Sequence, residues 1–126
     1  MEMVKNALSW FEIPVADFDR ARKFYGAIFD FEMPEFTMGP NRMGFFLMEQ
    51  GVGVGGAIVS GPGYEPAETG TLVYLNGGSD LTNVLNRVAG AGGTVAVPKT
   101  IINDELGYFA VFRDSEGNRV ALHSME

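Results

Sequence analysis

The order of one strand, one helix and three strands occurs twice in this 126-residue chain, and this repeat limits the folds that the sequence can adopt. Apolar runs predict eight strands, and apolar residues spaced three and four apart predict two helices. The strands are expected at residues 8–15, 31–33, 42–48, 56–60, 71–76, 94–97, 108–112 and 119–123, and the helices at 18–29 and 80–90. The repeat predicts an α+β fold of two tandem βαβββ modules, with curved mixed sheets and the helices outside.

Capping and turn residues mark where the two modules begin and end. Asp17 and Asp80 stand at the starts of the two helices, where a side-chain oxygen can accept a hydrogen bond from a free N–H group. A stretch rich in Gly, Pro, Glu and Thr separates the halves and is typical of a linker. The expected boundaries are 1–126 for a single domain, about 7–60 for module one, 61–70 for the linker and about 71–124 for module two.

Composition disfavours several classes of partner. The chain is 46% hydrophobic and 20% charged, which is typical of a globular protein. Its net charge of −7 disfavours nucleic acid, because phosphate contacts need clustered Lys and Arg. Residues 1–6 contain no long apolar run, so we expect neither a signal peptide nor a membrane anchor. The expectation is a cytoplasmic protein that binds neither nucleic acid nor membranes.

The chain has no cysteine and a single histidine, His123, which removes most nucleophile and metal chemistry. Disulfides, thiolate metal sites and a Cys nucleophile are excluded. No serine lies in the Gly-x-Ser-x-Gly elbow that would suit a triad with His123. The glycine run at residues 51–56 fits neither a dinucleotide fingerprint nor a phosphate loop, and tight turns and strand glycines explain it better.

Three segments resemble the glyoxalase/bleomycin-resistance/extradiol-dioxygenase superfamily, also called the vicinal oxygen chelate fold. They are Phe11-Glu-Ile-Pro-Val-x-Asp17 leading into Arg20-Ala21-x-x-Phe24-Tyr25, Gly92-Gly93-Thr-Val95-x-x-Pro98-Lys99, and Phe112-x-Asp114-x-Glu116-Gly117-Asn118-x-Val120-x-Leu122-His123. They occur in the right order and cover nearly the whole chain. The repeated unit read from the residues agrees with the fold that this resemblance implies. The resemblance also implies a homodimer, because members of this family cover exposed strand edges with a second chain.

The resemblance implies a divalent metal on the concave face, held by His and Glu from four strands. The matching positions in this sequence are Trp10, a position within 56–58, Leu72 or Val73, and Ala121. None of these positions is His, Asp or Glu. We therefore expect no metal site and no cofactor.

Strand parity predicts which side chains share the face where the resemblance places the ligand. If position 10 faces the cleft, so does Glu12, while the odd-numbered neighbours pack under the first helix. The expected face carries Glu12 and His123 as candidate catalytic residues, with Trp10, Tyr74, Asn76 and Arg119 as candidate ligand-binding residues. We expect this to be a mixed aromatic and polar pocket.

Each candidate also has a structural explanation. His123 can be a surface residue at a strand end, and Glu12 can pair with Arg or Lys. Trp10 can stack on a ligand or fill the space where a metal would lie. Tyr64, in the linker, either covers the pocket or is exposed.

Three functions fit these residues. The first is metal-free binding of a small organic molecule, for sequestration, resistance or sensing. The second is a lyase or isomerase related to lactoylglutathione lyase, with Glu12 and His123 as acid and base. The third is metal-dependent catalysis with rearranged ligands such as Glu12 and His123, which lacks the three protein ligands that a catalytic site generally needs.

Overall fold

The computed structural model describes residues 1–49 and 51–126, and over these residues it has eight strands and two helices. The elements are β1 (Trp10–Pro14), α1 (Phe18–Ile28), β2 (Glu35–Met38), β3 (Asn41–Phe45), β4 (Gly55–Ser60), β5 (Tyr74–Asn76), α2 (Thr82–Ala91), β6 (Thr94–Asn103), β7 (Gly107–Arg113) and β8 (Arg119–Ser124). The order strand, helix, three strands therefore occurs twice, as predicted.

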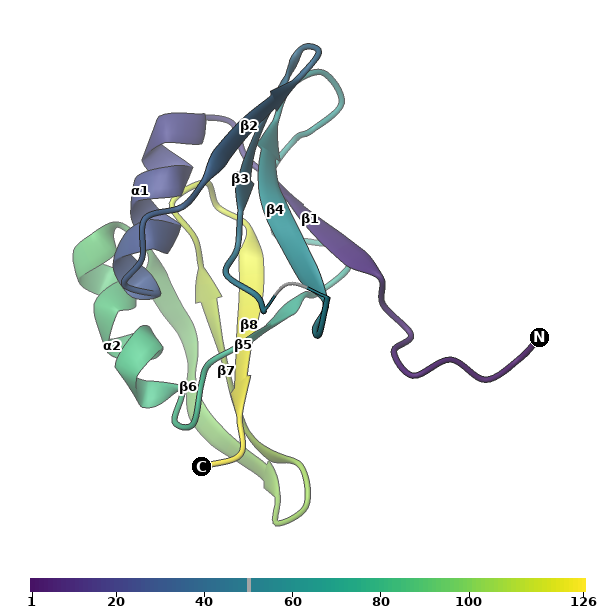
Figure 1. Cartoon of the computed structure of the whole chain (residues 1–126). Helices are drawn as coiled ribbons and strands as arrows, with labels where there is room; N and C mark the ends of the chain where they lie inside the picture. Colours follow the sequence, from purple (N-terminus) through teal and green to yellow (C-terminus); the bar gives the residue numbers. More distant parts are fainter. Residues whose placement is uncertain (50) are drawn as a thin grey trace.

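Each module forms its own four-stranded sheet, and both sheets have the same strand order (Figure 1). The first sheet is ordered β1-β4-β3-β2 and the second β5-β8-β7-β6. In each sheet the first strand runs parallel to its neighbour, and the remaining pairs are antiparallel. The sheets do not close into a barrel, so the predicted α+β fold of two tandem modules is confirmed.

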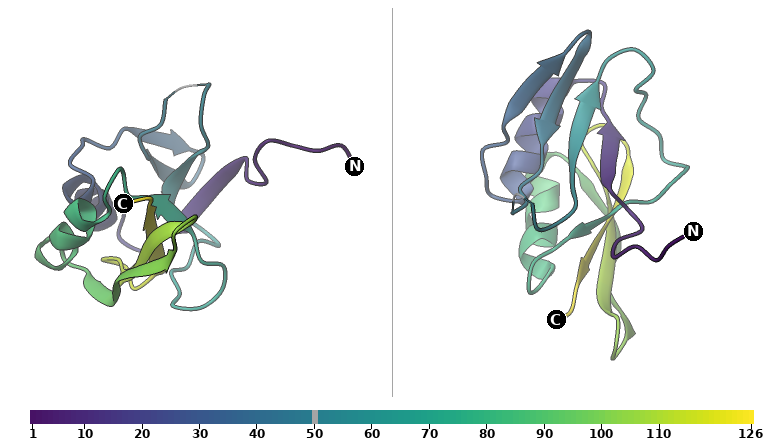
Figure 2. Two further views of the ribbon diagram at one scale, coloured as in Figure 1. Left: turned by 90° about the horizontal axis from the view of Figure 1, so that it is seen from below. Right: turned by 45° about the vertical axis from the view of Figure 1, so that its right-hand side comes forward.

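The two helices lie side by side and cover the same side of the molecule (Figures 1 and 2). Helix α1 begins as predicted, because the Asp17 carboxylate accepts a hydrogen bond from the Arg20 N–H at 3.0 Å. Helix α2 ends at Gly92, whose φ of 109° lies in the left-handed region that favours glycine. Asp17 thus sets the start of α1 and Gly92 the end of α2, and the buried apolar residues of each helix set the side that faces the sheets.

One apolar core joins the two modules between the helices and the sheets. Phe24 of α1 packs at 5.9 Å from Phe112 of β7, measured between ring centroids. Ile13 is buried, as strand parity predicts, and so are Val84 and Val88; Phe11, which parity also assigns to the core, is half-buried against it. Burial of Ile13 confirms the register of β1, because a slip by one residue would expose it.

The prediction of a strand at residues 31–33 is wrong, and the second strand begins at Glu35 instead. Pro34 has no N–H to donate to a ladder, and the backbone oxygen of Met33 accepts a side-chain hydrogen bond from Arg22 at 2.8 Å. The strand expected at 94–97 is longer, because β6 continues to Asn103 with register shifts against β7. Over the described residues, no helix is both long enough and apolar enough to cross a membrane.

Candidate functional site

Strand β1 directs Trp10 and Glu12 away from the core, onto what we call the outer face of the first sheet. Glu12 lies opposite Ala57 in β4, and Ala57 lies opposite Phe45 in β3. Residues in one such row share a face of the sheet. The outer face of the first sheet comprises Trp10, Glu12, Phe36, Met43, Phe45, Ala57 and Val59.

Two aromatic donors hold the carboxylate of Glu12. The Tyr64 hydroxyl donates to Glu12 Oε1 at 2.8 Å, and the Trp10 indole N–H donates to Glu12 Oε2 at 3.4 Å. The hydrogen bond to the Glu12 carboxylate raises the pKa of Tyr64 above its usual value, because it stabilises the protonated phenol. Tyr64 therefore folds back from the linker onto the outer face, where it also packs against the cluster formed by Met43, Ala57 and Val59.

Sequence reasoning left Tyr64 undecided and did not include it among the site residues. Its position in a linker rich in Gly and Pro gives no periodicity from which a facing direction can be predicted. The available signal was indirect: Glu12 is a carboxylate between two apolar residues of a strand, and an aromatic hydroxyl in the linker is one candidate donor to it.

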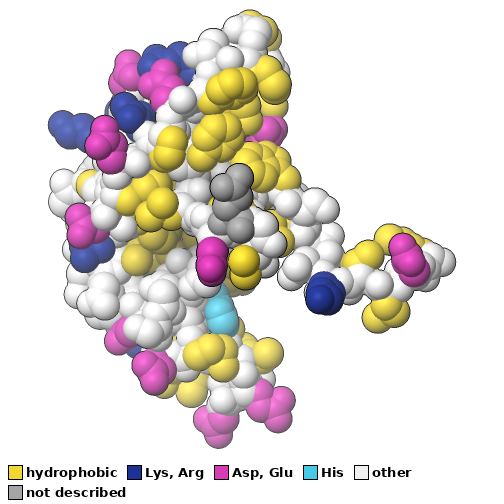
Figure 3. Space-filling view, in the orientation of Figure 1, with side chains coloured by type: hydrophobic (Ala, Val, Ile, Leu, Met, Phe, Trp, Pro, Cys, Tyr) yellow, Lys and Arg dark blue, Asp and Glu magenta, His cyan; other side chains and the backbone are white. Residues whose placement is uncertain are grey.

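Aromatic rings extend from Trp10 across the outer face of the first sheet. The ring centroids of Trp10 and Phe45 are 6.0 Å apart with an interplanar angle of 63°, and those of Phe36 and Phe45 are 6.2 Å apart. Trp10 remains 41% exposed and Phe36 51% exposed. In the space-filling view, hydrophobic side chains accordingly gather over β2, β3 and β4 (Figure 3).

A cleft of about 1120 Å³ runs along β1 and β5, the edge strands of the two sheets. Trp10 and Glu12 line it from the first sheet, and Tyr74, Asn76 and Arg119 line it from the second. Residues from both faces of edge strand β1 line the cleft, so the cleft also reaches residues that pack against the core. Its apolar part contains Phe11, Phe29, Phe31, Phe46 and Leu75. Five of the six candidate site residues thus border one space.

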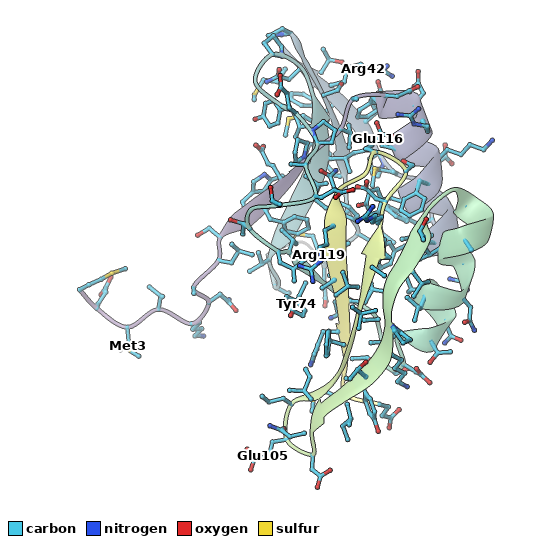
Figure 4. All side chains as sticks on the ribbon, turned by 180° about the vertical axis from the view of Figure 1, so that it is seen from behind. Met3, Arg42, Tyr74, Glu105, Glu116 and Arg119 are labelled. Carbon is cyan, nitrogen blue, oxygen red and sulfur yellow. The ribbon has the colours of Figure 1, made fainter. Side chains whose placement is uncertain are left out.

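Arg119 supplies a positive charge to the wall formed by the second sheet. Its side chain lies beside Tyr74 at the edge of that sheet (Figure 4). Its neighbour across the β7–β8 pair, Arg113, forms an ion pair with Glu68 at 2.7 Å. Within residues 1–49 and 51–126, no carboxylate pairs with Arg119 at ion-pair distance. Arg119 is therefore available to an anionic or carbonyl group of a ligand.

His123 shares the predicted strand position but does not border the cleft. It lies opposite Asn76 in β5 and Phe109 in β7, so the strand register agrees with the sequence analysis. Its Nε2 lies 2.5 Å from the carbonyl oxygen of Leu106, so this nitrogen carries the hydrogen and donates it. Among the described residues that line the cleft, His123 is absent. Of the two candidate catalytic residues, Glu12 therefore lines the cleft, whereas the side chain of His123 points to the turn between β6 and β7.

The positions at which the resemblance implies metal ligands do not fit a metal in this chain. Trp10 and Ala121 occupy two of them, and neither side chain is a metal ligand. In the part of the chain that the structure describes, no three His, Cys, Asp or Glu side chains gather closely enough to hold a metal ion. The groups that can act on a ligand here are the carboxylate, aromatic, amide and guanidinium groups already placed.

The turn between β7 and β8 fixes β1 in position beside the cleft. The Glu116 side chain is fully buried, and its Oε1 accepts hydrogen bonds from the N–H groups of Ala16 at 3.0 Å and Asp17 at 2.7 Å. Arg20 Nε donates to Glu116 Oε2 at 2.7 Å. Asn118 Nδ2 donates to the carbonyl oxygen of Pro14, the last residue of β1, at 2.7 Å. Sequence resemblance found these residues as a motif, and the structure shows that they join the second module to β1.

Glu116→Gln is expected to make stability less dependent on pH in the acid range. Burial alone would raise the pKa of Glu116, but hydrogen bonds from Arg20 and the Asp17 N–H outweigh it, so the pKa lies below its ordinary value of 4.5. The resulting stabilisation is complete above pH 4.5 and is lost as pH falls through the folded-state pKa. Urea unfolding between about pH 3 and 7 measures this slope.

The matched control is Glu105→Gln, which removes an equal charge from an exposed position. We expect Glu116→Gln to flatten the acid side of the stability curve and Glu105→Gln to leave it unchanged. Equal slopes for the wild type and Glu116→Gln would contradict the assignment.

The doubled βαβββ architecture and a family model that matches most of the chain together identify the class of the protein. The chain belongs to the Glyoxalase/Bleomycin resistance protein/Dioxygenase superfamily, whose family model matches residues 7–122. This confirms the resemblance seen in the sequence. No curated protein matches the chain.

Solved structures show the same fold. TnmS3, an antibiotic binding protein from Streptomyces sp. CB03234, is 22% identical with a TM-score of 0.64, and the match covers 98% of each chain. UcmS2 is 25% identical with a TM-score of 0.66, over 95% of this chain and 98% of that one. A glyoxalase/bleomycin resistance protein from Albidiferax ferrireducens T118 is 17% identical with a TM-score of 0.67, over 94% and 98%.

Proposed function

We propose that this chain binds a small organic molecule in a cleft that works without metal, and that binding serves sequestration, resistance or sensing. The observation that carries the proposal is the lining of the cleft. Trp10, Glu12 and Tyr74 border a space of about 1120 Å³, which is large enough for a drug-sized molecule. The residues at the matched metal positions have no side chains that could bind a metal ion. The similar fold of TnmS3, described as an antibiotic binding protein, supports binding as a task for this architecture.

The working form under this proposal is a homodimer in the cytoplasm. Strands β1 and β2 are the edges of the first sheet, and β5 and β6 are those of the second. The outer face of the first sheet carries exposed aromatic side chains, which a second copy would cover. Such a pairing would also enclose the cleft further. The small-molecule ligand and the second chain are the partners that we propose.

The alternative is a lyase or isomerase related to lactoylglutathione lyase, with Glu12 and His123 as acid and base. Glu12 satisfies the geometric requirement of bordering the cleft. His123 would have to leave the carbonyl oxygen of Leu106 to reach a ligand, or act from a second copy of the chain. This requirement favours binding over catalysis. Loss of turnover in His123→Ala, with ligand affinity retained, would favour the enzyme.

A screen of neutral, anionic and cationic aromatic compounds is expected to give at least one ligand that raises the melting temperature. A ligand at about 100 times its Kd stabilises a protein by about 2.7 kcal/mol, which corresponds to a shift of several degrees. Trp10, the single tryptophan, should change its fluorescence on binding because it borders the cleft. Differential scanning fluorimetry and tryptophan emission provide two separate readouts.

Two variants test whether such a ligand binds in the cleft. Tyr74→Ala is expected to weaken it at least tenfold, because the ring forms part of the cleft wall. The control is Ile102→Ala, which truncates an exposed side chain on β6 outside the cleft and should leave affinity within twofold. If no compound shifts the melting temperature, or if Tyr74→Ala binds as tightly as the wild type, binding in this cleft is refuted.

A further inference from the structure

The carboxylate of Glu12 is held in the cleft without a compensating positive charge from its own chain. Its two oxygens accept from Tyr64 and Trp10, which are both neutral donors. Over residues 1–49 and 51–126, no Lys, Arg or His nitrogen lies at ion-pair distance from Glu12. A carboxylate has about four acceptor positions, so two hydrogen bonds leave capacity for a further donor. Glu12 is exposed, so the cation or N–H donor of a ligand can reach these remaining positions and replace water there.

The surroundings of Glu12 favour a cation among these groups. Trp10 and Tyr64 contact it directly, and the Phe45 ring packs against Trp10 on the outer face of the first sheet. Aromatic faces carry the negative end of a quadrupole and attract organic cations, most strongly in the case of tryptophan. The net charge of −7 adds a long-range attraction of the same sign. Three separate features thus select for a cation at this end of the cleft.

We propose that the Glu12 end of the cleft takes an organic ammonium group attached to an apolar or flat body. This inference rests on the proposed binding function and names its ligand class. The ammonium would lie against the Glu12 carboxylate and the Trp10 ring, and the apolar body would extend toward Phe11 and Phe46 in the deeper part. A quaternary or tertiary ammonium suits the site better than a metal ion, because one carboxylate among aromatic rings is no chelating set.

Arg119 sets the direction in which such a ligand lies. Its guanidinium lines the opposite wall and repels an ammonium, so the cation stays beside Glu12. A carbonyl or anionic group elsewhere on the ligand would be oriented toward Arg119. The cleft therefore distinguishes the two ends of a polar ligand.

Choline and 3,3-dimethylbutan-1-ol test the proposal, because the two molecules share one shape and differ in charge. Each is titrated into the full chain at constant ionic strength, and the emission of Trp10 reports binding. We expect choline to bind at least tenfold more tightly than the alcohol. Glu12→Gln should weaken choline at least tenfold and leave the alcohol within twofold. Glu12→Asp, which keeps the charge, should retain most of the preference for choline.

The control is Glu32→Gln, which removes the same charge from an exposed position after α1 and should change neither affinity by more than twofold. Circular dichroism checks that each variant is folded. Equal affinities for the two probes, no binding of choline, or a choline affinity that Glu12→Gln does not change would each overturn the proposal. So would a loss of dimer mass in Glu12→Gln, because Glu12 would then pair with a basic group of a second copy.

The wider screen separates this inference from the binding function itself. If neutral or anionic compounds bind in a manner that depends on Tyr74 while choline does not bind, the cation site is refuted and the binding function stands. If no compound of any charge binds, both proposals fail.

Discussion

Asp114→Ala is expected to lower the free energy of unfolding by about 3 kcal/mol or more, because it removes the acceptor at the centre of a buried network. Asp114 Oδ2 accepts from the Tyr25 hydroxyl at 2.8 Å and from Asn118 Nδ2 at 3.0 Å. Asp114 Oδ1 accepts from the N–H groups of Glu116 and Asn118, each at 2.9 Å. Alanine would leave the buried Tyr25 hydroxyl and the buried Asn118 N–H without this acceptor, and Asn118 Nδ2 would keep only its hydrogen bond to Pro14.

Tyr25 shows how strongly this network depends on its acceptor. Burial and the neighbouring Asp114 carboxylate together hold the pKa of Tyr25 well above its usual value, so the phenol keeps its proton and donates it. Tyr25→Phe removes one donor and leaves Asp114 its three other hydrogen bonds, so we expect a smaller loss of about 1 kcal/mol. The loss of stability is expected to be larger for Asp114→Ala than for Tyr25→Phe, because Asp114→Ala leaves more hydrogen-bonding groups unpaired.

Urea unfolding monitored by Trp10 fluorescence and by circular dichroism measures these differences. The matched control is Asp104→Ala at the exposed turn between β6 and β7, which should change stability by less than about 0.5 kcal/mol. Because Asp114 in the second module bonds to Tyr25 in the first, we also expect one cooperative transition, as for a single domain. A loss below 1 kcal/mol in Asp114→Ala would refute the role assigned to this network.

The sequence predicted the fold because local signals and the repeat agree. Asp17 has the chemistry of a helix cap, and Gly92 permits the left-handed turn that ends the second helix. Strand parity placed Ile13 in the core and Glu12 on the opposite face. The strand predicted at 31–33 does not form, because apolar residues that only pack into the core give the same sequence pattern as a strand. Met33 is buried without joining a ladder.

The candidate site was less accessible from the sequence, because its completion depends on contacts between distant segments. The hydrogen bond from Tyr64 to Glu12 spans the linker, and no periodic pattern describes such a segment. The side chain of His123 bonds to the carbonyl oxygen of Leu106 in the turn between β6 and β7, although the strand row that it shares with Asn76 agrees with the parity prediction. Parity gives the face of a strand on which a residue lies, and it does not give the direction of a long side chain at the end of that strand.

Phe36→Asp is expected to convert the proposed homodimer into a monomer, weakening self-association at least 100-fold. Phe36 stands on edge strand β2 and is half exposed in the single chain. A carboxylate placed in an apolar interface costs several kcal/mol, and twofold symmetry places the substitution in the interface twice. Because Phe36 does not belong to the buried core, the fold of each chain should survive.

Sedimentation velocity over micromolar concentrations measures this change, with circular dichroism as the check on folding. Ala89→Asp adds the same charge to an exposed position on α2, which is not part of the outer face of the first sheet, and should leave the dimer intact. If Ala89→Asp alone dissociated the dimer, the helices would form the interface. A wild-type chain that stays monomeric throughout this range would refute the dimer itself, and Trp10, Phe36 and Phe45 would then form an open ligand-binding surface.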